Sequence, residues 1–231
     1  TVELAEELFN NKNIINIDHI SEFSSENVTK RFDRGDYLKK EFNDFWNEFF
    51  STEQDYYSKM PFEKLIRLKM AVRNINNLVT YESTIMAAKL IIDILNIGNE
   101  DQSKILTDIE STSENANGYD IEFHGNSPFI CEVKANIPSG GKDVFGDNQK
   151  EQILKDLKAL IYGKSKSRIA VNELNSYYKF MCFYSVGEKT IHAVCNMINN
   201  LEDDLANRIE FFNGQETLSK DKVYVIYVVK E

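Results

Sequence analysis

The chain has 231 residues, of which 42% are hydrophobic and 12% aromatic, so it is long enough to bury one substantial core. It contains no apolar run of the roughly 18 residues that a membrane span requires and no signal-peptide pattern, which predicts a soluble cytoplasmic protein without membrane contact. A formal net charge of −10 argues against a protein that coats nucleic acid through charge alone, because such binding rests on many Lys and Arg contacts to phosphates.

The amino-terminal region, residues 1–75, is rich in Asn, aromatic residues and acids, and its spacing predicts helices. Aromatic side chains fall on one broad helical face: Tyr37, Phe42, Phe45, Trp46, Phe49 and Phe50. Proline starts helices readily but disfavours helical geometry just before it, so a second helix is expected from Pro61 to about Asn76. Residues 59–73 carry five basic side chains against one acid. The region is therefore expected to supply dimer or DNA contacts, unless these charges only form solvated helix faces.

Residues 76–231 show alternating helical and strand patterns, which predict an α/β or α+β fold with a mixed central sheet flanked by helices. A helix from Tyr81 to Leu95 is apolar nearly all round and should end at Gly98. Three strands in a meander should follow, then a helix capped by Asp147 or Asn148, a fourth strand, one or two helices and a final strand. In chain order these elements are 105–109, Tyr119–Phe123, Phe129–Ala135, Gln149–Tyr162, Phe180–Val186, 189–211 and Val223–Val229.

Two acids and one lysine stand out on two adjacent predicted strands. Glu132 and Lys134 are two residues apart on one strand, so their side chains point to the same face while Cys131 and Val133 point to the other. A hairpin between this strand and the preceding one brings Asp120 beside Glu132. Two carboxylates and one ammonium group would then surround a single spot.

Such a cluster is costly in a protein interior, because two close carboxylates repel each other and a buried lysine loses its solvation. A divalent cation would offset this cost. Mg²⁺ prefers hard oxygen ligands, keeps several waters, and is held by one or two carboxylates together with substrate phosphate oxygens. The cluster therefore predicts a magnesium-dependent phosphodiester hydrolase, in which Lys134 orients the attacking water or stabilises charge on the phosphate.

The pattern of Asp120, eleven intervening residues and then Glu132-Val133-Lys134 resembles the PD-(D/E)XK nuclease superfamily. This superfamily includes restriction endonucleases and many repair and phage-defence nucleases. The resemblance spans roughly residues 81–186 and implies a restriction-endonuclease-like nuclease core within residues 76–231. The sequence departs from the family at Tyr119, which stands where a proline is usual.

The resemblance also implies roles for particular residues. The groups that would hold Mg²⁺, or Mn²⁺ in its place, are Asp120, Glu132 and the main-chain carbonyl of Val133. Lys134 would complete the site, and Glu82 matches a glutamate that the family often has on the helix before the sheet. Gln149 or Gln152 matches a polar residue on the helix after the motif strand, where it could bind substrate.

Each candidate also has an ordinary structural interpretation. Glu132 and Lys134 could form a charged pair on an exposed strand face, and Asp120 could cap the turn before its strand. Glu82 could be favoured near a helix start by the helix dipole alone. Lys142, in a Gly-rich loop, could contact a substrate phosphate, although the loop lacks the full spacing of a nucleotide-binding loop.

These features predict a magnesium-dependent DNA endonuclease of the type II restriction or phage-defence kind. Cutting both strands of a duplex usually requires two active sites, so a symmetric homodimer is the expected assembly. Two alternatives stay open: a nuclease of the same fold that acts on RNA or on branched or repair DNA, and a catalytically silent scaffold or regulatory module. Retention of the Asp, Glu and Lys set counts against the silent module.

Overall fold

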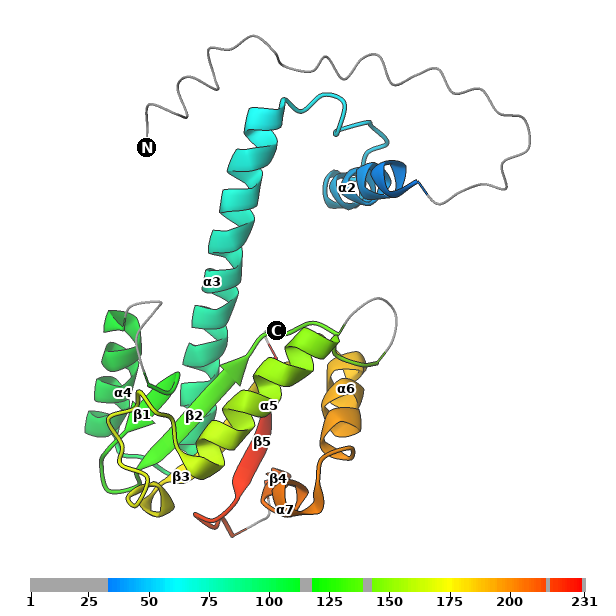
Figure 1. Cartoon of the computed structure of the whole chain (residues 1–231). Helices are drawn as coiled ribbons and strands as arrows, with labels where there is room; N and C mark the ends of the chain where they lie inside the picture. Colours follow the sequence, from blue (N-terminus) through cyan, green and yellow to red (C-terminus); the bar gives the residue numbers. More distant parts are fainter. Residues whose placement is uncertain (1–32, 113–117, 139–142, 215–216, 230–231) are drawn as a thin grey trace, which may run out of the picture. The chain divides into compact units, whose positions relative to one another are not determined.

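The computed structural model of the chain describes residues 33–112, 118–138, 143–214 and 217–229 (Figure 1). The chain forms two compact units, Thr1–Leu65 and Ile66–Glu231. This boundary falls before the one that the sequence predicts after residue 75, and both positions lie within one continuous helix. Within the described ranges, no helix combines the length and the apolarity that crossing a membrane would need.

The first unit is built on α2 (Arg34–Phe50), in the part of the chain where the aromatic spacing predicts a helix. Asp33 caps the helix, because its side chain accepts a hydrogen bond from the main-chain N–H of Asp36 at 3.0 Å. The aromatic rings pack on one another; Trp46 stacks on Phe50 with ring centroids 5.5 Å apart. No residue of α2 is buried, so the aromatic stripe does not form a closed core in the described part of this unit.

The helix α3 (Phe62–Ile94) is continuous where the sequence predicts two helices, one ending near Asn76 and one starting at Tyr81. No proline or glycine interrupts the intervening residues, so nothing breaks the ladder of main-chain hydrogen bonds there. Within this stretch the hydroxyl of Thr80 donates to the carbonyl of Asn76, one turn earlier, at 3.0 Å. Only the carboxyl-terminal part of α3, from Ser83 to Ile92, is buried.

The predicted strand at 105–109 is wrong: these residues lie in α4 (Asn99–Ser111). Ile105 is buried and Ile109 is partly buried four residues later, which is the spacing of one helical face. Gly98 caps the start of α4 and does not end the preceding helix. Acidic residues in the first turn of α4 interact favourably with the positive end of the helix dipole. The three-stranded meander is therefore a two-stranded hairpin.

The sheet has five strands in the order β1-β2-β3-β5-β4. The hairpin pairs β1 (Ile121–Phe123) with β2 (Phe129–Lys134) in antiparallel fashion, and all other neighbours are parallel. The remaining strands are β3 (Tyr178–Tyr184), β4 (Ile209–Phe211) and β5 (Val223–Val228). This mixed sheet confirms the predicted α/β or α+β class. The strand β4 was not predicted, since the sequence assigns 189–211 to helices.

Helices cover both faces of the sheet (Figure 1). On one face lie α5 (Asp147–Tyr162), α6 (Glu188–Ile198) and α7 (Asp203–Ala206), with a short 3-10 helix, η2 (Leu174–Ser176). On the other lie α4 and the buried part of α3. The cap of α5 is Gly146 and not Asp147 or Asn148 as predicted, because Gln149 Oε1 accepts from the Gly146 N–H at 3.1 Å.

Packing of α5 matters for function because this helix lies over β2. Leu157 is fully buried between α5 and the sheet, so Leu157→Ala should lower the free energy of unfolding by about 2–5 kcal/mol through lost burial and a residual cavity. Denaturant unfolding measures this loss. The neighbouring exposed Lys158, changed to Ala, should leave stability nearly unchanged. Equal effects of the two substitutions would contradict the docking of α5 on the sheet.

Candidate functional site

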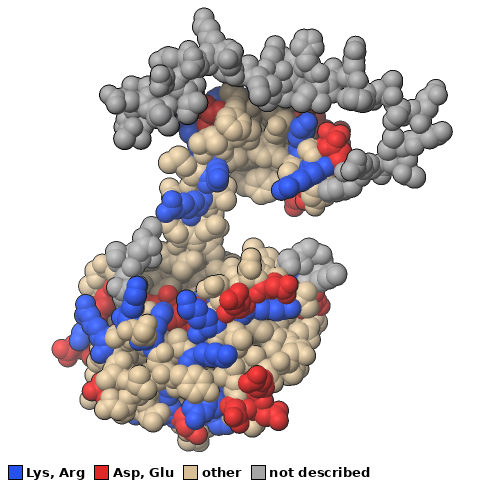
Figure 2. Space-filling model, viewed as in Figure 1, with Lys and Arg blue, Asp and Glu red and all other residues tan. Residues whose placement is uncertain are grey.

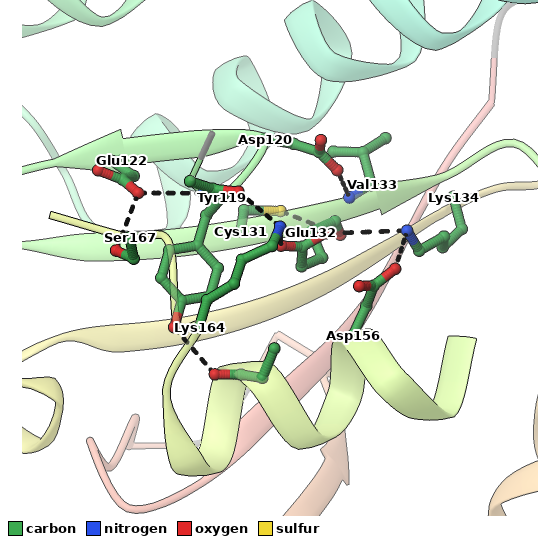
Figure 3. Close-up of polar contacts among 12 residues, drawn as sticks. Tyr119, Asp120, Glu122, Cys131, Glu132, Val133, Lys134, Asp156, Lys164 and Ser167 are labelled. Atoms are coloured by element: carbon green, nitrogen blue, oxygen red, sulfur yellow. Dashed lines mark hydrogen bonds and ion pairs between the residues drawn. The ribbon is translucent and has the colours of Figure 1, made fainter. Parts of the chain in front are cut away.

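The hairpin of β1 and β2 places Asp120 level with Glu132. The antiparallel register pairs Ile121 with Cys131, so the residue before β1 falls opposite the residue after Cys131. The main-chain N–H of Val133 donates to Asp120 Oδ2 at 2.7 Å. This hydrogen bond holds the Asp120 carboxylate against the strand that carries Glu132 (Figure 3).

The carboxylate of Glu132 is buried, with 2% of its side chain exposed, and it is contacted by two lysines. Lys164 Nζ donates to Oε1 at 2.7 Å, and Lys134 Nζ lies 3.8 Å from Oε2. Burial, and second the negative charge of Asp120, raise the pKa of Glu132 to about 7 against the opposing effect of the two lysines. Even with both lysines beside it, the carboxylate therefore gains a proton as the pH falls through about 7.

Lys134 extends from β2 toward α5, on the face opposite to Cys131 and Val133, which pack against α3 and α4. Its Nζ lies 2.5 Å from Asp156 Oδ2, and only 16% of each side chain is exposed. Burial lowers the pKa of Lys134, but the charges of Asp120, Asp156 and Glu132 outweigh it and raise the pKa above its usual value. Lys134 is therefore a fixed positive charge beside Glu132.

Lys164 follows Gly163, which ends α5 with a φ of 95°, a conformation that favours glycine. Its Nζ donates to the carbonyl of Gly118 at 2.5 Å as well as to Glu132, and lies 5.5 Å from the centre of the Tyr119 ring. The ring is itself held to α5, since the Tyr119 hydroxyl donates to a carbonyl of that helix at 2.9 Å. Lys164 thus ties the end of α5 to the hairpin.

Asp120 and Lys164 line an open pocket of about 260 Å³ whose other walls include residues of α3 and α4. A second pocket shares Tyr119 and Asp120 with the first and is also lined by His124 and Arg168. Asp120 therefore lies where the two pockets meet. A ligand in either pocket could reach this carboxylate, with a lysine on one side and an arginine on the other.

The donor set suits a small hard cation. Asp120 and Glu132 supply two carboxylates at one end of the hairpin, and the carbonyl of Val133 lies between Glu132 and Lys134 in the chain. Among the described residues, no group of three or more His, Cys, Asp or Glu side chains could enclose a metal ion. Asp120 and Glu132 would supply a bound Mg²⁺ with carboxylate oxygens, and water and substrate oxygens would complete its shell.

The other predicted site residues have different positions. Glu82 is half-buried on α3. It is not among the residues that line the first pocket, whereas Tyr81 and Thr84 are. Gln149 closes the start of α5, and its Nε2 donates to the carbonyl of Ile137 at 3.2 Å. Gln152 is exposed on α5. Lys142 lies outside the described residues.

Two residues at the site, Asp156 and Lys164, were not predicted. The sequence does contain a signal for Asp156. This acid lies three residues after Ile153 and four before Leu160, so it falls on the apolar face of α5. A charged residue there requires a buried partner. Lys164 had no comparable signal, since its contact with Glu132 spans 32 residues and depends on the length and direction of α5.

Comparisons of the chain with protein-family models, curated proteins and solved structures gave no match. Function must therefore be inferred from the chemistry of the site.

Proposed function

We propose that this chain is a magnesium-dependent DNA endonuclease of the PD-(D/E)XK kind, belonging to the type II restriction or phage-defence enzymes. The observation that carries the proposal is the convergence of Asp120, Glu132 and Lys134 at one end of a hairpin, where Asp120 lines an open pocket. A buried glutamate whose pKa is raised by burial and by a second carboxylate is typical of functional sites. The mixed sheet flanked by helices is compatible with a restriction-endonuclease-like core.

In this proposal each residue has a stated task. Asp120, Glu132 and the carbonyl of Val133 would hold Mg²⁺. The bound ion would polarise the phosphoryl group and provide hydroxide at neutral pH. Lys134, fixed by Asp156 at 2.5 Å, would keep a positive charge beside the phosphate oxygens as negative charge develops on them.

The distribution of charge supports a polyanionic substrate that is bound locally. Lys and Arg side chains are spread over the face of the sheet unit shown in Figure 2, with acidic side chains among them. Lys164 and Arg168 line the two pockets that meet at Asp120. Because the whole chain has a net charge of −10, binding must rest on such local contacts rather than on overall charge.

Cleavage of both strands would be achieved by a homodimer, with residues 1–75 supplying dimer or DNA contacts. The alternatives differ in substrate or in activity. The same site could cut RNA or branched or repair DNA. The internal ion pairs of Glu132 with Lys134 and Lys164 favour a second candidate, a silent module in which the cluster only holds the hairpin to α5.

The test is incubation of plasmid and phage DNA with the protein in Mg²⁺, in Mn²⁺ and in EDTA, with RNA and branched DNA in parallel. Cleavage should require the metal and should be lost in Asp120→Asn, which removes the negative charge of one metal ligand. Asp93→Asn, an exposed position on α3, makes the same change in charge and should cut normally. Cleavage of RNA or branched DNA alone would select the alternative substrate. No metal-dependent cleavage of any substrate would favour the silent module.

A further inference from the structure

The two lysines on Glu132 are held in different ways. Lys134 has a second carboxylate partner, Asp156, at 2.5 Å, and 16% of its side chain is exposed. Lys164 is 31% exposed, and among the described residues its ion pair is with Glu132. Lys134 therefore stays in place if its contact with Glu132 is lost, whereas no second carboxylate holds Lys164 in the part of the chain that the structure describes.

The ammonium of Lys164 occupies one oxygen of the carboxylate that a metal ion would bind. Glu132 Oε1 accepts from Lys164 Nζ at 2.7 Å, while Oε2 faces Lys134 Nζ at 3.8 Å. A divalent cation bound by both Asp120 and Glu132 would lie beside the Lys164 ammonium that hydrogen-bonds the same glutamate carboxylate, and the two positive charges would repel each other. The ion and Lys164 must then compete for the same buried carboxylate.

The pocket wall offers other contacts to a displaced Lys164. Its Nζ already donates to the carbonyl of Gly118 and lies over the Tyr119 ring, and both residues line the pocket that Asp120 also lines. An ammonium released from Glu132 can therefore stay at the pocket wall on these contacts. There it would be an exposed positive charge beside the proposed metal site, which is a suitable donor for a phosphate oxygen.

We propose that Lys164 is a resident counter-ion of Glu132 that a divalent cation displaces, and that the displaced ammonium then binds a phosphate of the substrate in the pocket. This inference rests on the proposed metal-dependent nuclease. It makes metal and substrate bind cooperatively. The metal takes the place of Lys164 at Glu132, and the released Lys164 ammonium then binds the substrate phosphate. Metal binding alone is weakened, and the site is loaded fully only when nucleic acid is present.

The test measures Mn²⁺ binding without nucleic acid, by calorimetry and by the loss of the free-ion signal in electron paramagnetic resonance, at about pH 8.5 so that Glu132 is ionised. Lys164→Met should bind Mn²⁺ about tenfold more tightly than the unaltered protein, since it lacks the competing charge. Lys164→Gln, which keeps a donor for the Gly118 carbonyl, should also bind more tightly. Lys166→Met, an exposed lysine on the same loop, should match the unaltered protein.

Binding of a DNA duplex in Ca²⁺ gives the second half of the test. Lys164→Met should bind DNA more weakly than Lys166→Met does, because only the former loses the phosphate contact at the pocket. Mn²⁺ affinity that is unchanged or lower in both Lys164 variants would overturn the inference while leaving the nuclease proposal in place. If no variant bound Mn²⁺ in a manner that depends on Asp120, both proposals would fail. If the Lys164 variants bound Mn²⁺ and the unaltered protein did not, the result would support the displacement.

Discussion

Lys134→Met should reduce metal-dependent DNA cleavage by about 10³-fold or more, because it removes the fixed ammonium that would face the reacting phosphate. Methionine keeps most of the length and volume of lysine, so the packing between β2 and α5 should change little. Single-turnover cleavage with saturating Mg²⁺ measures the loss. Lys158→Met, an exposed lysine on α5, carries the same change in charge and should cut at the normal rate.

The substitution also leaves Asp156 buried without its ion pair, so a loss of stability could imitate a loss of catalysis. The double variant Lys134→Met with Asp156→Asn separates the two effects. The Asp156→Asn change removes the unpaired charge, so the double variant should recover stability in a denaturant titration. Its cleavage should stay absent. Recovery of cleavage in the double variant would show that Lys134 only holds the hairpin to α5 and has no chemical role.

The hairpin that forms the site could be predicted because its determinants are local. The Asn126-Ser127-Pro128 turn and the alternation along Phe129–Ala135 fix which side chains share a face, and this placed Glu132 and Lys134 on one side of the strand. The register then carries Asp120 to the level of Glu132. The mixed sheet and most helices followed from the same periodicities.

What could not be predicted depends on distances in space. The helix α4 contains apolar residues at 105 and 109 that fit both a strand and a helix, and its packing on the sheet decides between them. The contact of Lys164 with Glu132 depends on where α5 ends, which no spacing in the sequence gives. The three residues of β4 are too short for a pattern, and pairing with β5 alone defines them.

The stability of the protein should depend on pH through Glu132. Burial, and then the charge of Asp120, raises the pKa of Glu132 from 4.5 to about 7, so the folded protein binds this proton more tightly than the unfolded chain does. The resulting stabilisation is complete below about pH 4.5 and is lost as the pH rises through about 7. Ionised Glu132 thus weakens the metal-free protein at alkaline pH.

Glu132→Gln removes this titration and keeps the shape of the side chain. Between about pH 5 and pH 8.5 in EDTA, the difference in the free energy of unfolding should move in favour of the Gln variant by about 2–3 kcal/mol. Denaturant titrations at several pH values measure the change. Glu151→Gln, an exposed position on α5, should give a pH profile parallel to that of the unaltered protein.

A divalent cation should reverse this dependence in the unaltered protein, because binding to the ionised carboxylates stabilises the folded state by mass action. Mn²⁺ at about pH 8.5 should therefore raise the stability of the unaltered protein and leave Glu132→Gln nearly unaffected. If Glu132→Gln followed the same pH profile as the unaltered protein in EDTA, Glu132 would already be ionised at low pH, with its charge balanced by Lys134 and Lys164. The cluster would then carry no unsatisfied charge for a metal ion to relieve, and the silent module would be the better description of this site.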